Sequence, residues 1–268
     1  FLQRSLITMN AFRDFLNKYP LTVFAILTYV LSWWSVPFAN GAIIPYGPFL
    51  AAIPVIALSQ GRAGVRDFFR RIVTSPNAWY WFLIGPALVI AYLLAALALN
   101  LLFGATITYT SHLQSIGSTA LTLLLLGGLW EEPGWTGYAL PLLQARYQNR
   151  SQGLLLATLH IGLIRAIWHL PLVISGAIPW YDMVFFEIAF QFLISWLYSG
   201  SGGSVLPVML FHLTSNIVGG GIIVPLFLGD NHTRFYLFFI AMAWLLALIL
   251  LLQNKRRTLN SDRNPNAG

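Results

Sequence analysis

Polar side chains of the kinds used in hydrolysis interrupt several otherwise apolar stretches of this sequence. A charged group at the centre of a bilayer costs about 2.5–3.5 kcal/mol on insertion scales, so such residues point first to a function. Because lipid offers no hydrogen-bond partner, each of them must face protein or water. The residues concerned are Glu131, Glu132, Arg165, His169, Glu187, His212 and Asn216.

Together these residue types permit hydrolysis. A carboxylate can act as the general base, and a histidine can hold the attacking water beside it or share a metal ion. A second histidine and an asparagine can donate hydrogen bonds to a developing oxyanion. His212 and Asn216 are four residues apart, as are Arg165 and His169, so the members of each pair share one helical face.

The adjacent residues Glu131 and Glu132 cannot face the same point, because neighbouring helical side chains diverge by about 100°. We expect one of them to face a shared centre and the other to bond elsewhere, to Arg165 or a backbone amide. Pro133 and Gly134 follow directly, and they are expected to open or kink the helix at that point.

Single polar residues in a membrane also have structural explanations. Taken alone, His212 is more often an interhelical hydrogen-bonding group than a catalyst. Glu187 fits a water-filled cavity and an interhelical pair equally well. His160 precedes His169 on the same segment and is expected to be structural, whereas His112 and His232 lie in expected loops and receive no role.

The composition indicates that membrane helices carry these residues. The chain has 268 residues, of which 57% are hydrophobic and only 9% charged, with a net charge of +7. A soluble domain has roughly a quarter charged residues, and disordered chains are charge-rich and poor in aromatics. Nucleic acid is not expected as a partner, because the basic residues lie at segment ends. The absence of cysteine excludes disulfides and thiolate metal sites.

The chain is therefore expected to be an all-α polytopic membrane protein with about eight transmembrane helices, each of about 20 apolar residues. The expected spans are residues 21–39, 42–59, 79–103, 117–143, 153–176, 183–198, 205–228 and 235–252. Thirteen of the 15 basic residues then fall on one side, which predicts that both termini are cytoplasmic. The expected parts are a cytoplasmic arm (1–20), the transmembrane domain (21–252) and a basic, disordered cytoplasmic tail (253–268).

Basic and apolar residues alternate over Arg62–Val73, between the second and third expected spans. This pattern is typical of a short helix that lies on the cytoplasmic leaflet. A plain loop that carries positive charge on the inner side explains the same composition equally well.

Three stretches resemble, in order and spacing, the motifs of the CAAX protease and bacteriocin-processing family. Residues 130–141, WEEPGWTGYALP, resemble the first motif, a glutamate pair with an arginine four residues after the second glutamate. Residues 167–171 look like the end of the second motif, which consists of an aromatic residue, three others and a histidine, here His169. Residues 207–216 look like the third, a histidine with an asparagine four residues later. The resemblance covers about residues 119–219.

The resemblance implies an intramembrane endopeptidase that opens to the cytoplasmic side. In that family's arrangement Glu131 activates water with His169, His212 and Asn216 stabilise the oxyanion, and Glu132 supports the site. The family has been described both as zinc-dependent and as glutamate-based, and this sequence does not decide between the two. Glu131, His169 and His212 could hold zinc with a water as fourth ligand, although they form no short helical metal motif.

Two positions depart from the family pattern. The family's arginine falls at Thr136, and its aromatic residue of the second motif falls at Arg165. We expect a relocation in which Arg165, on the face of His169, replaces the missing cation and pairs with Glu132 or Glu131. The alternative is that Arg165 disables His169, which would leave a catalytically degenerate membrane scaffold or bacteriocin-immunity protein of the same fold.

The expected partners are membrane lipid and a membrane-associated peptide or protein, lipidated or not. The expected location is the plasma membrane of a prokaryote, as a multi-pass protein. A transporter is disfavoured, because transporters often repeat their broken helices in matching halves. No second-half counterpart of residues 131–134 is present in this sequence.

Overall fold

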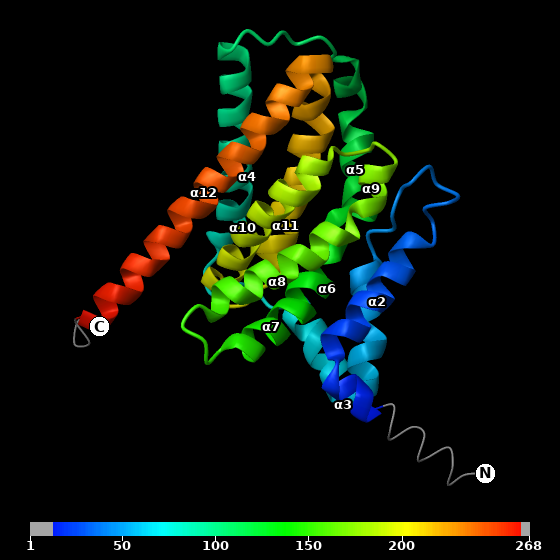
Figure 1. Ribbon diagram of the computed structural model, residues 1–268, viewed down its shortest axis with the longest axis vertical. Coiled ribbons are helices and arrows are strands. Elements are labelled where there is room, and N and C mark those ends of the chain that lie inside the picture. The colour runs from blue at the N-terminus through cyan, green and yellow to red at the C-terminus, as the bar shows by residue number, and fades with distance from the viewer. Residues whose placement is uncertain (1–12, 264–268) are drawn as a thin grey trace.

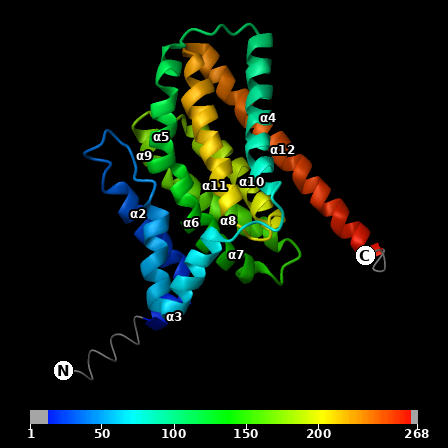
Figure 2. The ribbon, with the colours of Figure 1, turned by 180° about the vertical axis from the view of Figure 1, so that it is seen from behind.

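The chain folds into a bundle of helices, as a computed structural model shows for residues 13–263, with side chains described through residue 253. No strand occurs in this described part, so the all-helical prediction is confirmed. Its α-helices are α2 (Pro20–Trp33), α3 (Gly47–Val73), α4 (Trp81–Leu102), α5 (Ile116–Leu126), α6 (Glu132–Gly134), α7 (Leu140–Tyr147), α8 (Gly153–Trp168), α9 (Leu170–Ile174), α10 (Glu187–Gly200), α11 (Leu206–Thr214) and α12 (Gly229–Arg263). Figures 1 and 2 show α4, α5 and α11 running side by side, with α12 crossing the bundle obliquely.

Six helical segments of the described part are long and apolar enough to cross a membrane. They are Gly47–Val73, Trp81–Leu102, Ser111–Tyr147, Asp182–Gly200, Leu206–Leu226 and Gly229–Gln253. The first and fifth expected spans correspond to two shorter apolar helices, α2 with 14 residues and α8 with 16. A 14-residue helix extends only about 21 Å, less than the roughly 30 Å of a hydrocarbon core. The chain is thus a multi-pass membrane protein, and the count of eight spans stays a prediction.

Helix α3 is divided by a break at Gly61. The backbone there has φ 67° and ψ −162°, a combination that glycine adopts and that strains other residues. The expected second span covers residues 42–59, whereas the observed helix begins later, at Gly47, and continues past the break to Val73. Residues 62–73 are helical up to Val73, which confirms the short helix and rules out the plain loop.

The expected fourth span, residues 117–143, consists of several short segments. Helix α5 ends at Leu126, and Gly127 has an extended backbone with ψ 177°. A 3-10 turn over Gly128–Glu131 follows, and then comes α6. One break thus precedes the glutamates, and after Gly134 the helix opens into a π-helical turn over Trp135–Ala139, as expected. Pro133 lies in the first turn of α6, where its missing N–H leaves no hydrogen bond unmade.

Helix α12 extends beyond the expected end of the eighth span. It continues to Arg263, past residue 253, where the disordered tail is expected to begin. Three arginines, one lysine and one leucine in residues 254–263 are good helix formers, and an α-helix closes its hydrogen bonds locally whether or not lipid surrounds it. Residues 1–12 of the expected arm and residues 264–268 of the tail lie outside the described part.

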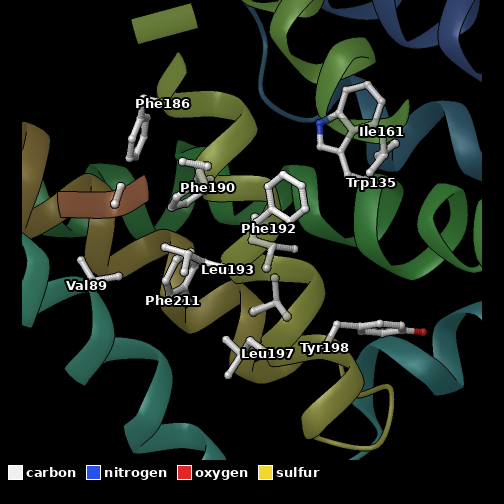
Figure 3. Close-up of a cluster of buried hydrophobic side chains, with 14 of the residues drawn as sticks. Val89, Trp135, Ile161, Phe186, Phe190, Phe192, Leu193, Leu197, Tyr198 and Phe211 are labelled. Atoms are coloured by element: carbon white, nitrogen blue, oxygen red, sulfur yellow. The ribbon is translucent and has the colours of Figure 1, made fainter. Parts of the chain in front are cut away.

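Aromatic side chains of α10 and its neighbours form the centre of the bundle (Figure 3). The rings of Phe190 and Phe211 stack with centroids 4.8 Å apart, and those of Phe186 and Phe239 lie 4.2 Å apart. Inside a membrane such contacts act through close packing, because lipid is as apolar as the side chains. Helix α10 packs on α8, α11 and α12, and this position brings its polar residues to the middle of the protein.

Candidate active site

A single guanidinium holds the carboxylates of three helical segments together. Arg165 of α8 is fully buried, and its Nη1 donates to Oε1 of Glu132 at 2.8 Å. Its Nη2 lies 3.6 Å from Oε2 of Glu131, and its Nε lies 3.7 Å from Oε2 of Glu187. The last two distances are those of ion pairs without a direct hydrogen bond. Three buried acidic side chains thus share one cation.

The relocation expected for the family's arginine agrees with this geometry. Thr136, at the family's arginine position, donates its hydroxyl to Oε2 of Glu132. Arg165 approaches the other oxygen of the same carboxylate. Glu132 therefore contacts a guanidinium, which α8 supplies instead of the segment that carries the first motif. The sequence predicts that Arg165 pairs with Glu132 or Glu131. In the structure, Arg165 lies within ion-pair distance of both glutamates.

The two glutamates divide as their angular separation predicts. Glu132 is fully buried and accepts hydrogen bonds from Arg165, Thr136 and Nδ1 of His212. It therefore bonds only to protein groups. Glu131 lines a cavity and is the member of the pair that a substrate can reach.

Glu132 also fixes the ring of His212, which α11 supplies. Nδ1 of His212 donates to Oε1 of Glu132 at 2.7 Å, so Nε2 points away from that carboxylate. A Cβ atom built on Gly128 would collide with Nε2 of His212 and with Oε1 of Glu131. The reactive edges of both side chains therefore lie against the Gly128 backbone, at a point where no side chain fits.

Helix α2 and the end of α8 position His169, which follows the last residue of α8. Tyr29 donates to the carbonyl of Ile164, and the indole of Trp33 donates to the carbonyl of Trp168. Nδ1 of His169 donates to the carbonyl of Arg165 at 2.9 Å. A carbonyl can only accept a hydrogen bond, so Nε2 carries the free lone pair of the neutral ring.

One cavity of about 360 Å³ brings the predicted catalytic residues together. Its lining includes Glu131, His169, His212, Asn216 and Glu187. Asn216 reaches it from a π-helical turn over Ser215–Ile223 that continues α11. Such turns occur frequently at functional sites. Arg165 and Glu132 are absent from the lining and lie behind it.

Sequence reasoning overlooked three residues of this region. Gln191 is fully buried and its Oε1 accepts from Arg165 at 3.4 Å. It lies four residues after Glu187, so the helical spacing could have found it. Asp182 lines the cavity from a π-helical turn, outside the expected sixth span. The close approach at Gly128 carried no recognisable sequence signal.

Glu187, which two explanations fitted equally well, belongs to the site. It lines the cavity, and its Oε1 lies 3.5 Å from Nε2 of His169. The other histidines lie apart from this cavity. His160 bonds to the hydroxyl of Tyr147 at 3.0 Å, which agrees with the structural role expected for it.

The residues suggested as zinc ligands do not fit a metal centre as they lie. Among the residues whose side chains are described, no three His, Cys, Asp or Glu side chains are arranged to hold a metal ion. Nε2 of His169 faces a carboxylate of Glu187, and a guanidinium stands next to Glu131. A cation held by Glu131 would lie close to the guanidinium of Arg165, and like charges repel, so we expect the side chains to carry out the reaction without a metal.

Comparison with known proteins supports a peptidase. The family described as type II CAAX prenyl endopeptidase Rce1-like matches residues 113–218, which include all three motifs. A CAAX prenyl protease 2 from Methanococcus maripaludis is 28% identical over 194 residues, which is 63% of this chain and 67% of that protein. Both findings agree with the resemblance that the three motifs carry, and they support a hydrolase that acts on peptides.

Proposed function

We propose that this chain, as a member of the CAAX protease and bacteriocin-processing family, is an intramembrane endopeptidase that uses Glu131 and His169 to activate water. The observation that carries the proposal is the shared cavity, which collects Glu131, His169, His212 and Asn216 from three separate regions of the chain. Chance alone would not bring a carboxylate, two imidazoles and an amide to one hollow inside an apolar bundle.

In the proposed reaction Glu131 takes a proton from a water molecule whose oxygen attacks the carbonyl carbon of the substrate. Nε2 of His169 holds this water by accepting its second hydrogen. The developing oxyanion accepts hydrogen bonds from the amide of Asn216 and from Nε2 of His212. For this role His212 carries both ring protons, since its Nδ1–H already donates to Glu132. Collapse of the intermediate breaks the C–N bond, and Glu131 returns its proton to the leaving amine.

Glu132 and Arg165 act as positioning residues in this mechanism. Glu132 sets the ring of His212, and Arg165 sets both glutamates. The placement of Arg165 also argues against the degenerate alternative. Its guanidinium points to the carboxylates and does not line the cavity, so it leaves the space beside His169 open to a substrate.

We further propose that the ends of the helices with most basic residues face the cytoplasm. The end of α3, with Arg70 and Arg71, and the start of α8, just after Arg150, lie toward one end of the bundle (Figure 1). The described end of α12 lies toward the same end, and its beginning, with Arg234, lies at the other (Figure 2). Basic residues favour the cytoplasmic side. The substrate would be a membrane-associated peptide, lipidated or not.

The experiment is a cleavage assay with the full chain in lipid nanodiscs and membrane-anchored peptides with and without a prenyl group. We expect cleavage that disappears in Glu131→Gln and in His169→Ala. A matched control is His160→Ala, which removes a histidine of the same helix that bonds only to Tyr147 and lies outside the cavity. Cleavage by the Glu131→Gln protein, or equal losses in the control, would contradict the proposed roles.

A further inference from the structure

The cavity contains a buried carboxylate that the proposed mechanism does not use. Asp182 is only 7% exposed and lines the cavity. No side chain of the described part forms a hydrogen bond or an ion pair with it, whereas Glu187 has the guanidinium of Arg165 within ion-pair distance. Burying a carboxylate without a partner is costly, so Asp182 lacks a partner that a ligand could supply.

Negative charge dominates this end of the cavity. The buried acidic residues are Glu131, Glu132, Asp182 and Glu187, and Arg165 is the basic residue paired with them. Among the residues whose side chains are described, no lysine or arginine lines the cavity. Arg165 and a protonated His212 together balance at most two of these four carboxylates. A cationic ligand would therefore be attracted to this end of the cavity.

Aromatic rings form the walls around the same carboxylate. The cavity lining includes Trp168, Phe186, Phe190, Tyr236 and Phe239. The face of an aromatic ring attracts a cation, and the attraction grows when water is excluded. A carboxylate surrounded by rings suits the apolar stem and charged head of a lysine or an arginine.

We propose that Asp182, together with Glu187, binds a lysine or arginine side chain of the substrate close to the bond that is cleaved. The inference rests on the proposed function for its link to cleavage. Glu187 N–H donates to the carbonyl of Asp182 across one π-helical turn, and Glu187 also faces His169. A helical turn rises about 5 Å, and an extended peptide covers that distance in about two residues. The cation therefore belongs within about two residues of the scissile bond.

A bound metal ion is the other class of cation to consider. The residues with described side chains contain no group of three His, Cys, Asp or Glu side chains placed to hold a metal ion. Two carboxylates among aromatic rings suit an organic cation with a long stem better than a divalent ion, which needs more oxygen ligands than these two side chains supply.

Binding tests the inference without requiring turnover. The probes are short palmitoylated peptides with an amidated C-terminus that carry one lysine, or its neutral isostere norleucine, at each central position in turn. They are titrated against the full chain in nanodiscs of zwitterionic lipid. We expect the lysine peptide to bind at least about tenfold more tightly at its best position, the usual worth of a buried charged hydrogen bond. This ratio should fall close to one in Asp182→Asn and remain high in Asp182→Glu.

A matched control is Asp67→Asn, which removes an aspartate that pairs with Arg70 on α3 and does not line the cavity. It should keep the wild-type ratio. Equal binding of both peptides to the wild type, or a preference for lysine that survives in Asp182→Asn, would overturn the inference. Selective binding without any cleavage would instead refute the proposed function and leave the cation site standing. Thermal unfolding of each variant shows that the comparison is made on folded protein.

Discussion

Replacing Arg165 by phenylalanine gives the most informative test of the charge cluster. The substitution restores the family's aromatic residue but removes the guanidinium that lies 2.8 Å from Glu132, 3.6 Å from Glu131 and 3.7 Å from Glu187. Breaking a buried ion pair by removing one partner typically costs 3–5 kcal/mol. We therefore expect Arg165→Phe to lose about 3–5 kcal/mol of unfolding free energy.

Cleavage should fall with stability, because the same contact positions the catalytic groups. Glu132 holds Nδ1 of His212 and would lose its guanidinium partner. A misplacement of about 1 Å at a catalytic group can cost about 100-fold in rate. We expect a loss of at least that size in Arg165→Phe.

A second substitution should rescue the first. Thr136 donates to Oε2 of Glu132, the oxygen that Arg165 leaves free. An arginine at position 136, as in the family pattern, would approach the same carboxylate from the other side. The double variant Thr136→Arg, Arg165→Phe should recover about 1–3 kcal/mol relative to Arg165→Phe, within the usual range of coupling between contacting residues. Thr136→Arg alone should be less stable than the wild type, because it places two guanidinium groups at one carboxylate.

The assay is unfolding of the full chain in detergent micelles, followed by circular dichroism, with peptide cleavage measured on the same preparations. Arg165→Lys is the conservative control and should give an intermediate result, since it keeps the charge but loses the planar fork. The reasoning is refuted if Arg165→Phe unfolds and cleaves as the wild type does. It is also refuted if the double variant is no better than the sum of the two single variants.

Further substitutions test separate parts of the site and fold. Gly128→Ala should reduce cleavage at least about 100-fold, because the new Cβ collides with Nε2 of His212; wild-type activity would refute the close approach at this glycine. Asn216→Ala should lower kcat by roughly 10²–10³-fold with little change in KM, as expected for one oxyanion donor, and a pure KM effect would argue for binding alone. Gly61→Ala should cost about 1–3 kcal/mol of stability, because its φ of 67° strains other residues, whereas Gly117→Ala, which meets open space in a helix, should cost nothing. Dialysis against a chelator should leave cleavage within about twofold of the untreated enzyme, and loss restored by added zinc would refute a reaction carried out by side chains alone.

Local sequence determined the helical class and most of the residues in the site. Long apolar segments must close their backbone hydrogen bonds internally in a membrane, so the composition alone required helices. Charged residues are so costly in such segments that Glu131, Arg165 and His212 are conspicuous from their positions in the chain. Their motifs and order carried the family resemblance, and the comparisons found similarity to the same kind of protease.

The breaks within helices were less predictable. Proline after the glutamates predicts an opening of the helix there, which the π-helical turn over Trp135–Ala139 provides, but it does not indicate the earlier break at Gly127. Proline fits the first turn of a new helix without loss, so its presence could not distinguish a break before it from one after it. The helical tail to Arg263 was missed for a related reason: the end of an apolar run marks the end of a lipid-facing stretch, and a helix can continue past it.

The sequence by itself determined which residues are too polar to face lipid and which share a helical face, because both follow from local spacing. Only the tertiary structure decided which of them meet. The pairing of Arg165 with three glutamates, the contact of Glu187 with His169 and the isolation of Asp182 all join or separate different segments. Those relations depend on how α8, α10 and α11 pack together, and the packing is set by the shapes of many side chains at once rather than by the spacing along any one segment.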